Sequence, residues 1–251
     1  MAGTAVQRRL TWRLADVVGV VAETLRVRTL RLSVPGWPGH LAGQHVDVRL
    51  TAEDGYQAVR SYSIASAPDG AEGLELTVER LDDGEVSPYL VDELRVGDQL
   101  EMRGPIGGYF VWDAAMGGPL LLVGGGSGIC PLMSMLRLRA ARSPGVPARL
   151  LQSSRSLEDV IYRSELEGLA AGDPELQVIH TLTRRQPPGW AGRRRRIDRE
   201  MLAEVAWPPR ERPLVFVCGP TALVETVAGS LVELGHDPAL VRTERFGPTG
   251  G

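Results

Sequence analysis

The sequence predicts a two-domain protein: an antiparallel six-stranded β-barrel followed by an α/β doubly wound parallel sheet. Three observations lead to this fold class. A length of 251 residues suits two domains better than one or three. Residues 11–112 contain short alternating runs separated by turn residues, as in a small barrel. From residue 119 onward, short apolar runs alternate with helical segments, which is typical of a parallel sheet covered by helices.

The barrel domain is expected at residues 1–113. Runs that alternate or are rich in β-branched residues are divided by clusters of Gly, Pro and Asp. The expected strands are residues 12–21, 25–34, 44–50, 57–64, 74–80 and 98–103. A short helix is expected at 86–94, between the fifth and sixth strands.

The α/β domain is expected at residues 118–251, after a Gly-rich linker at 113–119. Its strands are expected at 120–123, 148–153, 177–183 and 214–218, and its helices at 132–141, 158–171, 198–205 and 221–234. Ligands of such sheets bind beyond the carboxyl ends of the strands. The residues that follow each strand are therefore candidate site residues.

Composition excludes several classes of protein. A hydrophobic content of 43% and a charged content of 24% are ordinary for a globular protein with a full core. No stretch reaches the about 20 apolar residues of a membrane helix, and the N-terminus shows no secretory signal, so we expect a cytoplasmic protein. A net charge of −3 argues against a nucleic-acid partner. The two cysteines and four histidines lack metal-ligand spacing, so no metal site is expected.

The stretch from Arg60 to Ser66 (RSYSIAS) combines a cation, an aromatic ring and three hydroxyls. Arg60 can bind phosphate oxygens, Tyr62 can stack on a planar ring, and Ser63 can donate to a ring nitrogen. Ser61 lies on the opposite face of the expected strand from Arg60 and Tyr62. The stretch indicates a site for a phosphate joined to a planar heterocycle. The alternative is an ordinary strand with an arginine on its solvent side.

Two further stretches are suited to phosphate. Gly84-Glu85-Val86-Ser87 precedes the expected short helix, whose free N–H groups favour an anion; a capped helix that merely closes the barrel is the alternative. The run Gly124–Pro131 (GGGSGICP) follows an apolar strand and opens a helix, which is what a pyrophosphate requires. It departs from the G-x-G-x-x-G pattern because Ile129 occupies the third glycine position.

These motifs together resemble the ferredoxin–NADP reductase family. The resemblance rests on Arg60-x-Tyr62-Ser63-x-x-Ser66, Gly84-x-x-Ser87, Gly124-Gly125-x-x-Gly128-x-x-Pro131 and Cys218-Gly219-Pro220, which occur in the family's order. Arg103–Phe110 (RGPIGGYF) is similar to the segment that closes the family's flavin domain. The resemblance covers nearly the whole chain.

The resemblance assigns roles to individual residues. It implies that Arg60 holds the flavin phosphate, Tyr62 packs on the isoalloxazine and Ser63 addresses its N5 edge. It places Cys218 beside the nicotinamide and Phe246 near the flavin ring, with Glu244 close to Cys218. The expected catalytic set is Ser63, Cys218, Glu244 and Phe246; the expected cofactor-binding set is Arg60, Ser61, Tyr62, Ser63, Gly84, Val86, Ser87, Gly125, Gly126, Ser127, Gly128, Arg155, Thr183, Arg184, Cys218, Gly219, Pro220 and Phe246.

The ends of the second and third strands of the α/β domain favour NADPH over NADH. Residues 152–156 (QSSRS) contain Arg155 and no acid that would bind the ribose 2′-OH of NAD. Thr183-Arg184 adds a hydroxyl and a guanidinium at the same sheet edge, where the family often binds the 2′-phosphate. The run of arginines at 193–196 is expected to be a solvated loop face, with docking of an acidic partner as the alternative.

The resemblance implies a stand-alone FAD-dependent NAD(P)H oxidoreductase, monomeric, that passes electrons to a separate acceptor. A ferredoxin-type protein serving a monooxygenase system is the expected acceptor. FAD is preferred to FMN because Gly84–Ser87 offers a second phosphate site. Two alternatives stay open: a reductase of free flavin, ferric chelates or quinones, and a nucleotide-binding regulatory subunit without turnover.

Overall fold

The computed structural model of the protein describes residues 10–70 and 72–247. The expected absence of a secretory signal rests partly on residues 1–9, and the outer ends of the two expected domains fall at 1–9 and 248–251. These points lie outside the described residues. Within the described ranges, no helix is both long and apolar enough to cross a bilayer.

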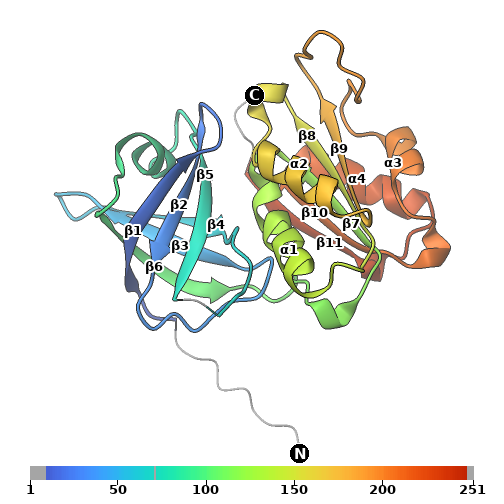
Figure 1. Ribbon diagram of the computed structural model, residues 1–251. Coiled ribbons are helices and arrows are strands. Elements are labelled where there is room, and N and C mark those ends of the chain that lie inside the picture. The colour runs from blue at the N-terminus through green and yellow to red at the C-terminus, as the bar shows by residue number, and fades with distance from the viewer. Residues whose placement is uncertain (1–9, 71, 248–251) are drawn as a thin grey trace, which may run out of the picture.

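All six expected barrel strands are present within a few residues of their predicted limits, and the predicted fold class is confirmed (Figure 1). They are β1 (Arg13–Ala22), β2 (Val27–Ser33), β3 (His45–Thr51), β4 (Gln57–Ser63), β5 (Gly73–Glu79) and β6 (Gln99–Ile106). They form one antiparallel sheet in the order β4-β3-β6-β1-β2-β5. A bridge between Ile64 and Leu76 brings the two edge strands together and closes the barrel.

Strand β5 shows how the period-two pattern of the sequence is used. Leu74, Leu76 and Val78 point into the barrel core. The alternate residues Glu75 and Thr77 therefore face outward, and both contact the α/β part of the molecule rather than solvent. The polar face of this strand is thus a surface between the two parts.

The helix expected at 86–94 is present as a short helical segment over residues 87–93, of π type in η1 (Tyr89–Glu93), whose Leu90 and Val91 are buried against the barrel core. Its position between β5 and β6 agrees with the sequence.

The α/β part contains a five-stranded parallel sheet in the order β11-β10-β7-β8-β9. Its strands are β7 (Leu120–Gly125), β8 (Ala148–Ser154), β9 (Leu176–Leu182), β10 (Leu214–Pro220) and β11 (Val241–Phe246). The sequence predicts the first four and misses β11. This strand pairs with β10 alone at the sheet edge, and its run VRTERF lacks the continuous apolar character of a central parallel strand.

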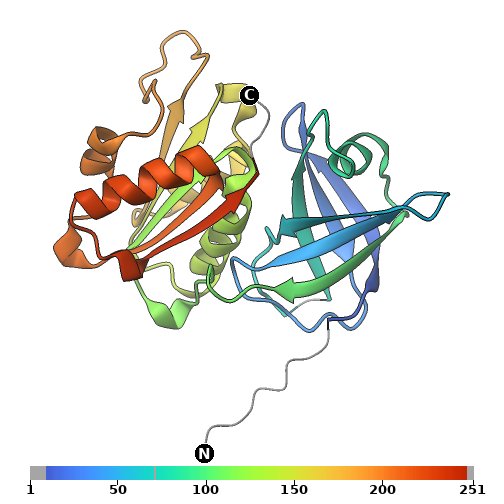
Figure 2. The same cartoon turned by 180° about the vertical axis from the view of Figure 1, so that it is seen from behind.

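Helices cover both faces of this sheet (Figures 1 and 2). Helices α1 (Ile129–Arg142) and α2 (Arg163–Gly172) pack on one face, and α3 (Arg199–Val205) and α4 (Thr221–Glu233) on the other. The helix expected from residue 158 begins later, because Leu157–Asp159 is a 3-10 turn and Tyr162 has a positive φ of 58°. A left-handed residue cannot continue an α-helix.

The two parts contact each other along α1 and β5 (Figure 1). Ser134 of α1 donates to the carbonyl oxygen of Ser66, and Arg137 of α1 donates to Glu75 of β5. Phe110 of the barrel segment packs edge-on against Phe216 of β10, with ring centroids 5.4 Å apart. Arg242 of β11 donates to the carbonyl oxygen of Val111 at 2.6 Å.

Candidate functional site

The larger cleft of the site has a volume of about 600 Å³ and lies between the barrel and the α/β sheet. From β4 it is lined by Arg60, Ser61, Tyr62 and Ser63, and from the segment before η1 by Gly84, Val86 and Ser87. The α/β part contributes Ser127, Cys130, Glu244 and Phe246. Two predicted motifs of the barrel and the C-terminal strand thus line one cleft.

Two serine side chains of β4 contact carboxylates of the protein, whereas Tyr62 presents a neutral ring to the cleft. Ser61 lines the cleft, yet its hydroxyl donates to Asp47 at 2.6 Å. The Ser63 hydroxyl lies 3.4 Å from a carboxylate oxygen of Glu244. Burial raises the pKa of the Tyr62 phenol, and the nearby Arg60 only partly opposes this. Tyr62 is therefore a neutral ring that keeps its proton at physiological pH.

Arg60 is held at the mouth of the cleft by an ion pair with Glu85, whose other oxygen accepts a hydrogen bond of 2.8 Å from the Tyr56 hydroxyl. Both charged side chains are about half exposed, at 50% and 46%. An exposed pair contributes little net free energy, so an incoming phosphate can replace Glu85 as the partner of Arg60. The sequence gives no sign of this carboxylate contact.

The segment Gly84–Ser87 closes one end of the larger cleft. The Ser87 hydroxyl is buried and accepts a hydrogen bond of 3.0 Å from the backbone N–H of Leu81. A Cβ added at Gly84 would lie 2.8 Å from that hydroxyl oxygen, so only glycine allows this close approach. The hydroxyl proton of Ser87 remains available to donate to an anion.

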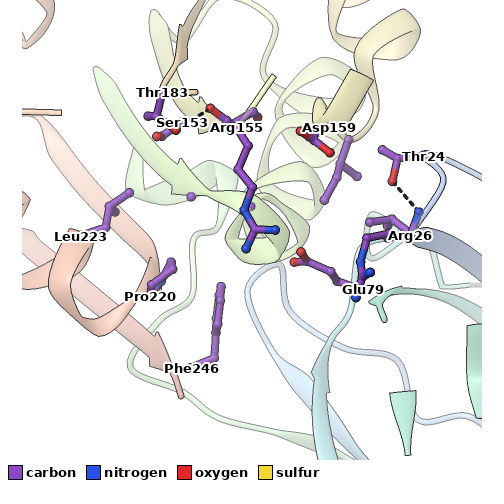
Figure 3. A pocket seen from close by; sticks show the side chains of 15 residues that line it. Thr24, Arg26, Glu79, Ser153, Arg155, Asp159, Thr183, Pro220, Leu223 and Phe246 are labelled. Carbon is purple, nitrogen blue, oxygen red and sulfur yellow. Dashed lines mark hydrogen bonds between the residues drawn. The ribbon is translucent and has the colours of Figure 1, made fainter. Parts of the chain in front are cut away.

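A second, smaller pocket of about 150 Å³ lies at the carboxyl ends of the parallel strands. Figure 3 shows Arg155 reaching into it, with Pro220, Leu223 and Phe246 on one side and Arg26 and Glu79 of the barrel across from it. Gly125, Gly126 and Thr183 complete the predicted residues that line it. This is the edge at which ligands of wound sheets bind.

The glycines of the loop after β7 have distinct roles. Gly126 lines the pocket with a positive φ of 54°, a conformation that favours glycine. Gly128 lines neither cavity; a Cβ added there would lie 2.2 Å from the carbonyl oxygen of Cys218. Gly128 therefore allows the loop to pack directly on β10, while Gly125 and Gly126 face the pocket.

The two arginines expected to read a 2′-phosphate differ in position. Arg155 lines the smaller pocket, and among the described residues its guanidinium has no hydrogen-bond or ion-pair partner. Arg184 is exposed and does not line the pocket; its backbone N–H donates to the carbonyl oxygen of Arg155 at 2.9 Å. Thr183 lines the pocket and donates to the carbonyl oxygen of Ser154 at 3.2 Å.

Cys218 and Glu244 lie opposite each other on the adjacent parallel strands β10 and β11. Cys218 is only 1% exposed and, like Gly219, does not line either cavity. Burial, and then the nearby Glu244, raise the pKa of the Cys218 thiol. Burial raises the pKa of Glu244 to about 6, although the hydrogen bond from Ser63 acts in the opposite direction. Cys218 is thus a neutral thiol behind Glu244, and Glu244 can hold a proton at the cleft.

The two cavities share a wall. Glu79 and Phe246 line both of them, and the Ser127 hydroxyl donates to Glu79 at 2.9 Å. A ligand in the larger cleft and one in the smaller pocket would therefore approach each other beside Phe246. Sequence reasoning names Phe246 but misses Glu79, because that residue ends a strand and belongs to no motif.

The arginine run at 193–196 makes several contacts within its own part of the chain. Arg193 forms an ion pair with Glu204, and Arg195 forms ion pairs with Asp198 and Glu200. These are exposed or half-exposed contacts outside both cavities, in keeping with the expected solvated loop.

Known proteins give a consistent identification. The family described as "Oxidoreductase FAD-binding domain" matches residues 17–111, and "Oxidoreductase NAD-binding domain" matches residues 122–229. Ferredoxin–NADP reductase B of Sorangium cellulosum is 38% identical over 210 residues, which cover 82% of this chain and 84% of the relative.

Two further relatives are longer than this chain. The glycine betaine monooxygenase reductase subunit of Chromohalobacter salexigens is 34% identical over 236 residues, covering 92% of this chain but 63% of that protein. The crystal structure of the Amycolatopsis cytochrome P450 reductase GcoB has a TM-score of 0.83 and 27% identity, covering 96% of this chain and 71% of that one. With an FAD-binding barrel and an NAD-binding wound sheet joined along the two cavities, the chain belongs to the ferredoxin–NADP reductase family.

Proposed function

We propose that the protein is an FAD-dependent NAD(P)H oxidoreductase that passes electrons to a separate acceptor. The observation that carries the proposal is the wall shared by the two cavities, since Phe246 and Glu79 line both. Hydride transfer requires the two reacting rings to lie about 3–3.5 Å apart in a fixed orientation. Adjoining cavities on one seam are what such an approach requires.

The larger cleft fits FAD in both size and chemistry. Its volume is about 600 Å³, and it joins a neutral aromatic ring, an arginine with a replaceable partner, and a Gly-x-x-Ser segment with a hydroxyl free to donate. Arg60 and Ser87 would bind the two phosphates, and Tyr62 would support the ring system. When bound, FAD accepts a hydride from the reduced nicotinamide and releases the two electrons singly.

The chain's own contribution to the chemistry is orientation and control of protons. Ser63 lines the cleft, and by turning away from Glu244 its hydroxyl could donate to the ring nitrogen that receives the hydride. Glu244 lies 3.4 Å from that hydroxyl and holds a proton up to a pH of about 6. Cys218 lies next to Glu244 on the adjacent strand as an uncharged thiol, so the Glu244 carboxyl has no second negative charge from Cys218 beside it.

NADPH is the preferred reductant in this proposal. Arg155 places in the smaller pocket a guanidinium that has no partner within the described part of the chain, and Thr183 lines the same pocket. An arginine at the end of the second parallel strand accommodates a 2′-phosphate, whereas an acid would favour NADH. Asp159 also lines this pocket, but it comes from the 3-10 turn after the strand end.

A ferredoxin-type protein of an oxygenase system is the proposed acceptor. In support, the Sorangium relative is named a ferredoxin–NADP reductase and the Chromohalobacter relative a monooxygenase reductase subunit. Because the chain spans 63% of that second relative, its partner has to be established for this chain itself. A monomeric state and a cytoplasmic location stay predictions.

The decisive experiment uses colour. The purified protein is expected to be yellow from bound FAD, and anaerobic NADPH should bleach its visible absorbance; turnover with a panel of ferredoxins, ferric chelates, free flavin and quinones then identifies the acceptor. A colourless protein that binds only the pyridine nucleotide would contradict the proposal and favour a regulatory role.

A variant tests the assignment of Cys218. Cys218→Ala should retain FAD and slow its reduction, because the buried thiol lies next to Glu244 on the adjacent strand and its loss would alter the packing behind that carboxyl. Stopped-flow flavin reduction measures this directly. An unchanged rate would remove Cys218 from the residues that matter for hydride transfer.

A further inference from the structure

One face of helix α1 carries three side chains that each contact the barrel. They are Cys130, Ser134 and Arg137, spaced four and three residues apart, so they lie in one row along the helix. The Cys130 thiol lies 3.6 Å from the carbonyl oxygen of Thr77, and the Ser134 hydroxyl donates to the carbonyl oxygen of Ser66 at 2.6 Å. We call these three residues the α1 row.

Arg137 makes the largest number of these contacts. Its Nε and Nη2 atoms donate to the two carboxylate oxygens of Glu165 in α2, at 2.8 and 2.7 Å. Its Nη1 atom donates across the seam, to the carbonyl oxygen of Ala65 at 3.0 Å and to Glu75 at 2.7 Å. The side chain is 19% exposed, so water screens these bonds less than those of a surface pair.

The guanidinium of Arg137 also lies 5.2 Å from the ring centre of Tyr162. Tyr162 has a positive φ of 58°, is 2% exposed, and donates its hydroxyl to Thr77 of β5. A buried aromatic residue keeps that backbone conformation only where its surroundings enforce it. The preceding residue, Ile161, lines the smaller pocket. The loop beside the nucleotide pocket is therefore anchored to the flavin-side strand.

The residues that contact the α1 row lie close in sequence to the flavin motif, and the row itself lies close to the glycine loop. Helix α1 begins directly after the glycine loop of the nucleotide pocket. Ala65 and Ser66 follow Tyr62 and Ser63 of the flavin motif by two to four residues. A change in the position of Arg137 would therefore reach both cavities through short segments: α1 leads to the glycine loop, and Ala65 leads to the flavin motif.

We propose that Arg137 is a positioning residue for hydride transfer: its bonds to Ala65, Glu75 and Glu165 fix the nucleotide pocket relative to the flavin cleft. The inference rests on the proposed function and adds to it a residue that touches neither cavity. Arg137 acts on the distance and angle between the two bound rings, while the groups that bind each ring are elsewhere.

The test is Arg137→Met, studied as the FAD-loaded protein. The dissociation constants of FAD and of NADPH should stay within about threefold of the parent values, because both cavities keep their lining residues. The rate of flavin reduction at saturating NADPH should fall about 10- to 100-fold, since a misplacement of about 1 Å can cost 100-fold. The long-wavelength absorbance that arises when nicotinamide and flavin rings stack should fall with it.

Two variants decide the matter if Arg137→Met does not yield folded protein. Arg137→Lys keeps the charge but loses the two-pronged contact with Glu165, and Glu75→Gln keeps the volume at the seam but removes the cross-seam charge. Each should slow flavin reduction about three- to tenfold. The matched control is Arg163→Met, which removes an exposed i,i+4 pair with Glu167 on α2 and should leave the rate unchanged.

The outcomes separate this inference from the proposed function. If the parent protein binds FAD and is reduced by NADPH, but the Arg137 and Glu75 variants are reduced at the parent rate with the same stacking absorbance, the positioning role is overturned. A loss of FAD affinity without a slower saturating rate also overturns it, because that assigns Arg137 to cofactor binding. A parent protein that is not reduced at all contradicts the proposed function instead.

Discussion

The two cavities are built from different parts of the polypeptide. In the larger cleft, the proposed flavin site, the side chains of Arg60, Tyr62 and Ser63 project from the regular backbone of one strand, β4. The smaller pocket depends on the backbone itself, where Gly125 and Gly126 leave the space open and Gly128 lets the loop lie on β10. The larger cleft is formed by side chains that can bind a ligand, whereas the smaller pocket exists largely because its glycines have no side chains.

This difference determines how each site responds to substitution. A side chain in the larger cleft contributes one interaction, and its removal costs that interaction while the strand stays in place. At Gly128 of the glycine loop, an added methyl group collides with the backbone of β10. We therefore expect graded losses in the flavin cleft and an all-or-none loss on substitution of Gly128 in the nucleotide loop.

The largest expected effect is that of Gly128→Ala. The added Cβ would lie 2.2 Å from the carbonyl oxygen of Cys218 and 2.5 Å from its carbon. Relieving this overlap requires a shift of β10 or of the loop, at about 3 kcal/mol, the upper end for overpacking. Urea unfolding should show this loss of stability, and NADPH binding should be lost.

The control for that substitution is Gly168→Ala in helix α2. A Cβ at Gly168 would meet nothing within 4 Å, and alanine favours a helix over glycine by about 0.5–1 kcal/mol. This variant should be slightly more stable than the parent, with unchanged NADPH binding. A Gly128→Ala protein that behaves like Gly168→Ala would show that the loop can adjust.

Next in size is Arg60→Ala. Losing charge-assisted bonds to a phosphate should weaken FAD binding by about 1.5–3 kcal/mol, or about 10- to 100-fold. The Glu85 carboxylate would then keep its hydrogen bond from Tyr56 but lose its cationic partner, and its negative charge would oppose the phosphate. Glu85→Gln in the Arg60→Ala background should therefore recover part of the lost affinity. Fluorescence titration with FAD measures all three proteins, and full retention in Arg60→Ala would move the phosphate away from β4.

A third effect follows from Glu244, whose pKa burial raises to about 6 in the folded protein, against 4.5 when unperturbed. The folded state prefers the protonated acid, so the stabilising contribution is full below about pH 4.5 and is lost as pH rises through 6. Relative to Glu244→Gln, the parent should lose about 2 kcal/mol of stability between pH 4.5 and 7, at about 1.4 kcal/mol per pKa unit. Urea unfolding of both proteins in the same cofactor state tests this. A constant difference would mean that Glu244 is solvated.

Sequence predicts the local parts of this molecule well. The strands of the barrel and four strands of the sheet follow from period-two alternation and from apolar runs bounded by turns. The glycine loop is predictable because its chemistry is contained within eight consecutive residues. Strand β11 escapes prediction because its pairing with β10 comes from a partner distant in the chain, and VRTERF carries no apolar run of its own.

What sequence misses is how residues far apart in the chain meet. LELTVE predicts a strand with one polar face, but not that this face would contact α1, Tyr162 and the glycine loop instead of water. Glu85 occupies a variable position of the Gly84-x-x-Ser87 motif and Glu79 belongs to no motif, and each acquires its role only from a neighbour more than twenty residues away. Arg155 and Arg184 look alike in sequence, and only the structure separates them.

The different positions of Arg155 and Arg184 lead to the prediction with the smallest expected effect on nucleotide binding. Arg155→Ala should raise the KM for NADPH about tenfold and leave the KM for NADH nearly unchanged, because the lost guanidinium lies in the pocket without a partner among residues 10–70 and 72–247. Arg184→Ala should have less than about a threefold effect on either nucleotide, since that side chain is exposed and lines neither cavity. Steady-state kinetics with both nucleotides compares the two variants under the same conditions.

Equal effects of Arg155→Ala on NADPH and NADH would mean that this arginine binds a part of the nucleotide that both share. A larger effect of Arg184→Ala would mean that Arg184 moves into the pocket when the nucleotide binds. Either result would show that a side chain also governs affinity in the pocket built by the backbone, and would narrow the contrast between the two cavities.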